Sequence, residues 1–259
     1  MNSLHELLEA PARQSAMLGV TEHRPWPLPS SRWLMAQTWE QLLFAHWRVP
    51  IERLRTHLPA ELLQAGLEVD THEGDAWVGV TPFRITNLRF RGTPALPRLS
   101  SFLELNCRTY VSRGGEKPGI WFFSLDASSR LAVEAARRLY KLPYFQARMD
   151  GLPRYRCSRV GADRPHVWES SYRPTGPVAP AAEGTLEHFL VERYCLYTSD
   201  DTGALYRAEI HHSPWPLQPA EAEIDLNTMA PDGLATTGEP VLHYSERQDV
   251  LVWPLGPYP

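Results

Sequence analysis

The stretch Phe102-Leu-Glu-Leu-Asn-Cys-Arg-Thr-Tyr-Val111 alternates in character from one residue to the next. Alternate residues of a β-strand point to opposite faces, so the pattern predicts a strand with two different sides. One side is mostly apolar: Leu103, Leu105, Cys107, Thr109 and Val111. The other carries a carboxylate, an amide and a guanidinium between two aromatic rings: Phe102, Glu104, Asn106, Arg108 and Tyr110. This second side is either a solvated outer face or the polar wall of a pocket, and the function depends on which it is.

The composition is that of a folded protein without an electrostatic preference for nucleic acid or membranes. The chain has 259 residues, 43% of them hydrophobic, which is enough for one large domain or two small ones. The formal charge of −4 and the pI near 6.2 lack the basic footprint of nucleic-acid or anionic-membrane binding. Among 26 basic residues only Lys117 and Lys141 are lysines, which limits where an amine catalyst could lie.

The cysteines and the N-terminus bear on the cellular compartment. Cys107, Cys157 and Cys195 lie far apart and form no CxxC pair, which disfavours a structural zinc site or a disulfide framework and indicates a reducing cytoplasm. The first ten residues carry early charges and no long apolar run, unlike a signal peptide. No stretch approaches the roughly 18 to 20 apolar residues needed to span a bilayer. We therefore expect a cytoplasmic protein with no membrane partner.

The N-terminal third is predicted to combine an arm with short elements. Residues 1–30 are expected to form an extended arm lying on the domain, because prolines cluster near its end and disfavour helix. Period-two alternation predicts a strand over residues 37–49, followed by a short helix over residues 51–57. Strands over residues 67–71 and 76–83 are expected to form a hairpin, and residues 84–100 a loop rich in Arg, Gly and Pro.

The clearest helix begins after Ser128 or Ser129, either of which can cap it, and runs to about Leu142. Its apolar residues fall within one arc, which is expected to face the core: Leu131, Ala135, Leu139 and Leu142. Arg138 lies at the edge of this arc, an unusual place for a charge. Pro143 then ends the helix.

The rest of the chain is mostly strand-like. Further strands are predicted over residues 119–126, 144–149, 154–160, 167–172, 194–197, 205–212 and 250–253, with a short helix over residues 184–192. The strands over residues 194–197 and 205–212 are expected to form a hairpin around Asp200–Gly203, and a polar segment is expected from Ala220 up to the last strand. No internal repeat or linker divides the chain. We expect a single α+β domain over residues 31–259, built mainly on antiparallel strands.

The charged and polar groups on the strand predicted over residues 102–111 are the first candidates for catalytic or binding roles. A buried Glu104 would need Arg108 or another donor to stay ionised, or its pKa would rise and it could act as an acid or base. If the same face is exposed, the row is an ordinary solvated surface. His46, between Ala45 and Trp47, is equally open to a packing role, and Tyr144 at the helix–strand junction could simply plug the helix end.

Motifs for other chemistries are missing from the sequence. It contains no GxGxxG, GxxxxGK[ST], HExxH or GxSxG, so nucleotide, metalloprotease and serine hydrolase functions lose their usual support. His211 and His212 are neighbours on a predicted strand and point to opposite faces, which disfavours joint metal binding. We expect neither a metal nor a cofactor.

The motifs taken together resemble a known family. They keep one order along the chain: Phe44-Ala-His-Trp-Arg-Val49, Leu58-Pro59, Phe102–Val111, Phe123-Ser-Leu-Asp-Ala127, Leu139-Tyr-Lys-Leu-Pro-Tyr144, Gly184–Tyr194 and His212-Ser-Pro-Trp-Pro-Leu217. Across roughly residues 24–257 the sequence looks like the bacterial YqjF-like family, which is uncharacterised and grouped with the acetoacetate decarboxylase-like superfamily. The resemblance implies a mainly antiparallel, closed or cone-like β-barrel with a few short helices and a central pocket.

The resemblance also implies what has changed at the site. The Schiff-base lysine of the decarboxylase follows a helix and a proline, and Tyr144 stands at that position here, with Phe145 in place of the neighbouring lysine. Neither side chain can form an imine. Glu104 matches a pocket glutamate of the decarboxylase, which favours an inward orientation for its face. Arg108 is then available to bind an anion.

Two functional hypotheses lead. The first is a cofactor-independent acid–base enzyme acting on an oxo or carboxylic compound as a lyase, isomerase or hydrolase. In it Glu104 and Tyr144 are catalytic, whereas the expected substrate-binding residues are Arg108, Asn106, His46 and Arg138. The second is a non-enzymatic protein that binds a small molecule in the same pocket. A purely structural module is a third alternative, and a homo-oligomer is compatible with each.

Overall fold

Four long strands form the centre of the molecule. The computed structural model describes residues 4–96, 99–234 and 236–258. The strands are β1 (Met35–Val49), β3 (Ala76–Phe90), β4 (Phe102–Arg113) and β5 (Glu116–Ala127). They lie in the order β1-β3-β4-β5, each antiparallel to the next.

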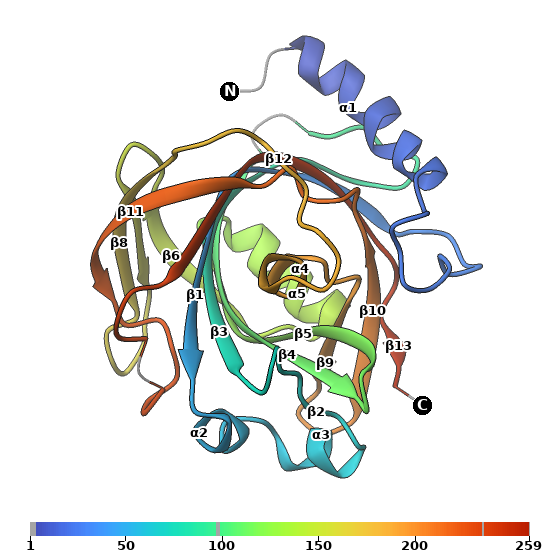
Figure 1. Cartoon of the computed structure of the whole chain (residues 1–259). Coiled ribbons are helices and arrows are strands. Elements are labelled where there is room, and N and C mark those ends of the chain that lie inside the picture. The colour runs from blue at the N-terminus through green and yellow to red at the C-terminus, as the bar shows by residue number, and fades with distance from the viewer. Residues whose placement is uncertain (1–3, 97–98, 235, 259) are drawn as a thin grey trace.

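Three further strands close these four into a ring (Figure 1). They are β9 (Cys195–Ser199), β10 (Leu205–His211) and β12 (Val241–Val252). Strand β9 runs parallel to β5, β10 pairs with β9, and β12 pairs with both β10 and β1. We call the closed circuit β1-β3-β4-β5-β9-β10-β12 the main ring.

A second circuit leaves the main ring at β5 and returns at β12. It consists of β6 (Tyr144–Asp150), β7 (Tyr155–Arg159), β8 (Val167–Pro174) and β11 (Gln218–Asn227). Strand β6 is parallel to β5, and the other pairs are antiparallel. We call this circuit the side ring; it is the lobe that carries β8 and β11 in Figure 1. Two short strands complete the sheet: β2 (Glu68–Val69), which pairs with β4, and β13 (Gly256–Pro257), which pairs with β10.

The helices are short and lie around the rings. They are α1 (Leu4–Ala16), the 3-10 turn η1 (Met17–Gly19), α2 (Ile51–Arg55), α3 (Ala60–Gln64), α4 (Arg130–Tyr140) and α5 (Leu186–Val191). Helix α5 covers one opening of the main ring, where the carbonyl of Leu190 accepts a hydrogen bond from Tyr110. No described helix is both long and apolar enough to cross a membrane.

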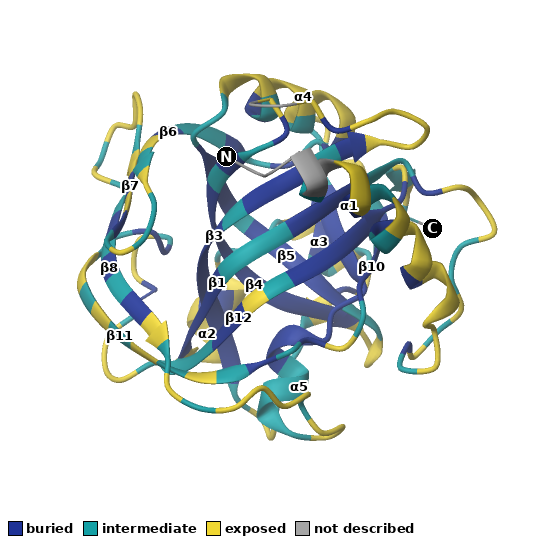
Figure 2. Cartoon of the chain, turned by 90° about the horizontal axis from the view of Figure 1, so that it is seen from above, coloured by how far each residue is buried: buried dark blue, intermediate teal, exposed yellow. Residues whose placement is uncertain are grey.

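Strands β1, β3, β4 and β5 border both rings, and we call them the shared strands. Both of their faces are buried because a different apolar cluster packs against each. One face contributes Phe44 and Tyr110 to an apolar cluster that also contains Leu196 and Ile210 of β9 and β10. The opposite face contributes its apolar side chains to a cluster with the side-ring residues Ala147, Tyr155, Cys157, Trp168 and Tyr172. Figure 2 shows long stretches of these strands in the dark blue of buried residues, with teal segments of intermediate burial on β1 and β3. Glu104, Asn106 and Arg108 alternate with the second set, so they face the interior of the main ring.

The expected fold is confirmed: one α+β domain, mostly of strands, with a few short helices. The predicted hairpin around Asp200–Gly203, the α4 cap at Ser129 and the strands on either side of them are present. Pairs β5–β6 and β5–β9 are parallel, because each is reached through a helix-containing connection rather than a hairpin.

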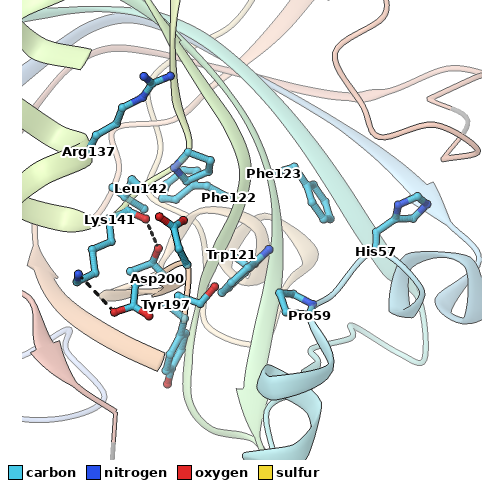
Figure 3. Close-up of a pocket in the computed structure, with 14 residues that line it drawn as sticks. His57, Pro59, Trp121, Phe122, Phe123, Arg137, Lys141, Leu142, Tyr197 and Asp200 are labelled. Carbon is cyan, nitrogen blue, oxygen red and sulfur yellow. Dashed lines mark hydrogen bonds and ion pairs between the residues drawn. The ribbon is translucent and has the colours of Figure 1, made fainter. Parts of the chain in front are cut away.

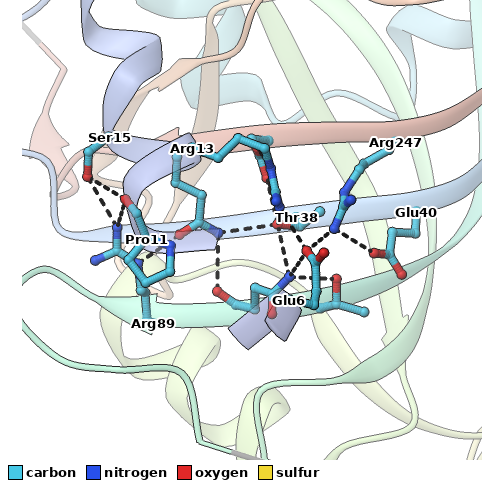
Figure 4. Close-up of polar contacts among 12 residues, drawn as sticks. Glu6, Pro11, Arg13, Ser15, Thr38, Glu40, Arg89 and Arg247 are labelled. Carbon is cyan, nitrogen blue, oxygen red and sulfur yellow. Dashed lines mark hydrogen bonds and ion pairs between the residues drawn. The ribbon is translucent and has the colours of Figure 1, made fainter. Parts of the chain in front are cut away.

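The N-terminal arm was expected to be extended, and this is wrong for α1. Its buried positions Ala10 and Gln14 recur at helical spacing, but the helix docks largely through polar groups, which hides it from a search for apolar periodicity. Gln14 donates to Thr38 and accepts from Arg89, and Arg13 forms an ion pair with Asp249. Figure 4 shows Arg13, Thr38 and Arg89 among these polar contacts.

Three other predictions also fail. Strand β3 continues to Phe90, into the expected loop of residues 84–100. Residues 68–69 pair with β4 instead of forming a hairpin with β3, although a tight turn still joins His72 to Asp75. The polar segment expected from Ala220 onwards contains most of β11, which spans residues 218–227, because the alternate side chains of this strand that are exposed need not be apolar.

Helix α4 buries a different face from the expected one. Leu131 is 67% exposed and Leu139 is 45% exposed, whereas Val133 and Tyr140 are buried. The Tyr140 hydroxyl donates to the carbonyl of Trp253, so an aromatic contact outweighs the leucine arc.

Candidate functional site

A buried carboxyl–phenol pair lies inside the main ring. The Tyr144 hydroxyl donates a hydrogen bond of 2.9 Å to Oε2 of Glu104. Glu104 is 3% exposed and Tyr144 is 8% exposed. Burial raises the pKa of Glu104 to about 8, and the nearby Asp126 adds to the rise while the bond from Tyr144 opposes it. Burial and the adjacent Glu104 raise the pKa of Tyr144 well above its ordinary value, so at neutral pH both groups hold their protons.

The chain before Tyr144 is fixed by three devices. Helix α4 ends with Lys141 in the left-handed conformation, at φ 51°, and Pro143 prevents its continuation. Thr198 donates to the carbonyl of Lys141 at 2.8 Å. Arg137 donates through Nε to the carbonyl of Tyr144 itself at 2.7 Å. The phenol therefore starts β6 from an anchored backbone.

Arg108 is a buried cation with little compensation. It is 4% exposed, and its Nη2 reaches the carbonyl of Leu190 at 3.4 Å. The guanidinium also lies 5.4 Å from the ring centroid of Phe44 and 5.8 Å from that of Tyr110. Its Nε has no hydrogen-bond partner, and among the described residues no carboxylate forms an ion pair with it. Glu104 is four residues away on the same strand, roughly 13 Å at about 3.3 Å per residue. A buried charge without a partner is unfavourable by several kcal/mol, so this position is suited to an anion.

His46 and Tyr110 lie beside Arg108. The Tyr110 hydroxyl donates to the Leu190 carbonyl at 2.7 Å, so it accepts from Nε2 of His46, also at 2.7 Å. This assigns the ring proton to Nε2 and leaves Nδ1 as an acceptor, which has no partner in the described structure. Burial and the charge of Arg108 hold the pKa of His46 well below its ordinary value. His46 is therefore a neutral hydrogen-bonding group.

Between the Glu104 and Arg108 positions lies a second set of unpaired polar atoms. Asn106 is opposite Thr81 in the β3–β4 register, and both are buried. Within the described residues, Oδ1 of Asn106 and Oγ1 of Thr81 have no hydrogen-bond partner. Buried polar groups are normally satisfied, so unpaired atoms along one wall indicate a place for ligand or water.

Gly79 makes room for this arrangement. It pairs with both Arg108 and His46 in the sheet. A Cβ at this position would come within 2.8 Å of the His46 ring and 3.5 Å of Cγ of Arg108. The glycine lets the imidazole lie against the β3 backbone, which is a close approach that no other residue type permits.

The structure brings five of the six expected site residues to one interior: Glu104, Asn106, Arg108, His46 and Tyr144. Arg138 was a wrong choice, because it lies on the exposed side of α4 outside the ring. Thr81, Gly79 and Tyr110 were missed. A glycine inside the apolar run Val78-Gly-Val80 was the available signal for close packing, and Tyr110 already shared the face of Arg108.

The two lysines lie outside this interior. Lys141 forms an ion pair with Asp200 at 3.4 Å on the rim of a surface cavity of about 580 Å³ (Figure 3). Lys117 pairs with Glu209 at 3.8 Å. Both side chains are more than a third exposed. Within residues 4–96, 99–234 and 236–258, no group of three or more His, Cys, Asp or Glu side chains is placed to hold a metal ion.

Comparison with known families matches residues 36–249 to DUF2071, described as an uncharacterised conserved protein. The chain belongs to this family. It is 45% identical over 234 residues to the uncharacterised protein YqjF of Bacillus subtilis strain 168, covering 88% of this chain and 94% of that one. The expected resemblance to YqjF-like proteins is thereby confirmed.

Solved structures similar to this DUF2071 member are acetoacetate decarboxylase-like. One is an acetoacetate decarboxylase-like enzyme from Sphingomonas wittichii RW1, with a TM-score of 0.59 and 15% identity over 91% of this chain and 97% of that one. Another is the enduracididine biosynthesis enzyme MppR complexed with pyruvate, with a TM-score of 0.59 and 12% identity over 92% and 93%. A third is acetoacetate decarboxylase of Legionella pneumophila, with a TM-score of 0.55 and 13% identity over 92% of this chain and 96% of that one. At these identities the likeness establishes the fold.

Proposed function

We propose that this protein is a small-molecule enzyme that performs acid–base chemistry on an oxo acid inside the main ring. The observation that carries the proposal is the buried hydrogen bond between Tyr144 and Glu104, on the same interior wall as the uncompensated Arg108. In this scheme Arg108 binds the substrate carboxylate, and the Glu104–Tyr144 pair lies beside the reacting carbonyl. His46 and Asn106 orient the substrate.

The protonation states favour Glu104 as an acid at neutral pH. A carboxyl with a pKa of about 8 holds its proton at pH 7 and can give it to a developing enolate or alkoxide. Tyr144, neutral and adjacent, stabilises the same oxygen by a hydrogen bond. Above pH 8 Glu104 becomes a base, so the two directions of proton transfer have opposite pH profiles. Lyase, isomerase and hydrolase steps all fit this arrangement.

Imine chemistry is not part of the proposal. The side chain at the position of the decarboxylase lysine is a phenol, and Lys117 and Lys141 are both engaged with carboxylates at the surface. The description of MppR with bound pyruvate supports a short oxo acid as the kind of ligand to test first. Borohydride treatment in the presence of acetoacetate should leave the protein unmodified, and an adduct at Lys141 would contradict the scheme.

The test is to measure binding and turnover of pyruvate and acetoacetate by calorimetry and proton NMR. Glu104→Gln and Tyr144→Phe are expected to keep binding and to lower turnover by roughly 100-fold or more, which is the usual effect of removing a general acid. Arg108→Met is expected to weaken binding by at least about tenfold. Arg138→Gln, on the exposed side of α4, is the matched control. Unchanged binding and turnover in all three variants would refute the proposal.

A binding protein without catalysis is the second candidate. The interior is rich in aromatic contacts, since Trp215 packs at 4.9 Å on Phe44 and at 6.0 Å on Trp39. Such walls suit an aromatic or apolar metabolite. Recovery of a bound compound chemically unaltered after incubation, identified by mass spectrometry, would favour this candidate over the enzyme.

A further inference from the structure

Strand β5 changes neighbours part-way along its length. At Trp121 it pairs with Tyr197 of β9, and at Leu125 it pairs with Tyr144 of β6. Among the described strands, none pairs with residues 122–124 on this edge. The main ring and the side ring therefore separate here, and we call this place the fork.

The surface cavity of about 580 Å³ lies at the fork and touches both sides of the ring wall (Figure 3). Trp121 and Tyr197, which line it, belong to an apolar cluster outside the main ring. Phe122 and Leu142 also line it, yet they belong to the apolar cluster inside the main ring. The cavity is therefore bounded by members of both clusters.

Phe122 and Leu142 separate this cavity from the candidate site. Phe122 is directly opposite Arg108 in the β4–β5 register, so its side chain points to the same interior. Leu142 and Pro143 immediately precede Tyr144 and line the cavity from the other side. Phe122 and Leu142 are therefore the residues shared by the lining of this cavity and the apolar cluster next to the candidate site.

The opposite opening of the main ring is closed more firmly. A cavity of about 440 Å³ lies there, lined in part by Phe189 and Arg193. Arg193 donates to the carbonyl of Phe189 at 2.7 Å and pairs with Asp70 at 2.5 Å. Tyr110 bonds the Leu190 carbonyl at 2.7 Å. Opening this end breaks several buried hydrogen bonds, some of them to charged groups.

Opening the fork requires fewer hydrogen bonds to break than opening the end covered by α5. The partition there consists of apolar side chains, which can change rotamer without breaking a hydrogen bond of their own. The backbone behind them stays in place, because Thr198 holds the carbonyl of Lys141 and Arg137 holds that of Tyr144. A change of side-chain rotamer at Phe122 therefore leaves these backbone hydrogen bonds in place.

We propose that small organic acids reach Arg108 and the Glu104–Tyr144 pair through the fork, and that the Phe122 side chain sets the size limit of what passes. This assignment of the ligand rests on the proposed function, whereas the route itself depends only on the shape of the wall. Phe122 is accordingly a specificity-determining residue, and smaller side chains there admit bulkier acids.

The experiment measures access without requiring turnover. Asn106→Cys places a reporter thiol on the interior wall, and its reaction with methanethiosulfonate ethylsulfonate, an organic anion, is followed by mass spectrometry. The rate is compared in the Phe122→Ala and Phe189→Ala backgrounds, which delete the same aromatic ring at the two ends. Variants lacking the reporter give the background from the buried native cysteines. Thr81→Cys serves as a second reporter if the first does not fold, as judged by circular dichroism.

We expect Phe122→Ala to accelerate labelling by at least about tenfold and Phe189→Ala by less than about twofold. Acceleration by Phe189→Ala alone, by both variants equally, or by neither would overturn the proposal. Because labelling does not involve Glu104 or Tyr144, failure here leaves the acid–base test intact. Conversely, unchanged turnover in the Glu104 and Tyr144 variants would refute the proposed function without affecting the route.

Discussion

The two faces of the shared strands treat buried charge in opposite ways. On the side-ring face, Arg159 binds Asp126 through two hydrogen bonds of 2.7 and 2.8 Å, and the two side chains are 7% and 0% exposed. On the main-ring face, Arg108 and Glu104 are just as buried, yet each lacks a charged partner among the described residues. The charged groups on the two faces are equally buried, so the faces differ in whether a buried charge has a charged partner.

The phenols repeat the contrast. Tyr155, on the side-ring face, donates to backbone carbonyls of Phe83 and Glu104 and is satisfied by the fold. Tyr144, on the main-ring face, donates to a titratable carboxyl whose pKa is strongly raised. Buried polar groups that find their hydrogen-bond or charge partners within the protein stabilise the sheet. Buried polar groups without such partners are available to a ligand.

The largest effect is expected from the pH dependence of stability at Glu104. Its pKa is about 8 in the folded protein against an ordinary 4.5. Between these values the unfolded chain has released the proton that the folded chain still holds, so raising the pH favours unfolding. The wild type should lose up to about 5 kcal/mol relative to Glu104→Gln between pH 4.5 and 8. Urea unfolding at several pH values measures this, with the exposed Glu134→Gln as control. Parallel pH profiles for wild type and Glu104→Gln would contradict the raised pKa.

Breaking the Arg159–Asp126 ion pair should lower the free energy of unfolding by nearly as much. Arg159→Met leaves Asp126 buried without its partner and is expected to lower the free energy of unfolding by about 3 to 5 kcal/mol at pH 7. The double variant Asp126→Asn with Arg159→Met removes both charges and should recover most of the loss. A single-variant loss below about 1 kcal/mol would mean that this pair is not structural.

Gly79→Ala tests the close packing behind the candidate site. The new Cβ would meet the His46 ring at 2.8 Å, so overpacking should destabilise the protein by about 1 to 3 kcal/mol. Combining it with His46→Ala should relieve the clash. Gly19→Ala, where a Cβ meets nothing within 4 Å, is the matched control for thermal unfolding. Equal melting temperatures for Gly79→Ala and Gly19→Ala would refute the tight contact.

The smallest change in stability is expected at Arg108. Since this guanidinium has no ion pair to lose, Arg108→Met should change the unfolding free energy of the ligand-free protein by less than about 1 kcal/mol, or raise it. This is the opposite of Arg159→Met, although both arginines are buried. A loss of several kcal/mol, measured by the same urea titration, would show that Arg108 is structural and would remove the anion anchor.

Much of the sheet followed from local pattern. Alternation predicted β1, β4 and β5, and turn residues predicted the β9–β10 hairpin, because period and turn chemistry act over a few residues. Elements that dock through polar groups escaped the same reasoning, as α1 did with Gln14 and Arg13. The buried face of α4 escaped it too, since the choice between Leu131 and Val133 depends on what the sheet presents to the helix.

The candidate site divides in the same way. Alternation alone placed Glu104, Asn106 and Arg108 on one face of one strand, and the family resemblance placed Tyr144 at the lysine position. Thr81 and Gly79 come from another strand, and their contribution depends on the β3–β4 register, which local sequence does not specify. The rejection of Arg138 likewise required knowing which side of α4 meets the sheet.

A strand with one charged face follows from the sequence alone, because residue identity and a period of two are local properties. The resemblance to acetoacetate decarboxylase-like proteins implied, in addition, that Tyr144 stands at the position of the decarboxylase's lysine. The closing of the ring is what buries the charged face, brings Tyr144 to Glu104 across 40 positions of sequence, and leaves Arg108 without a carboxylate among the described residues. Burial and pairing depend on which distant strands close the ring, and they turn an alternating pattern into a candidate site.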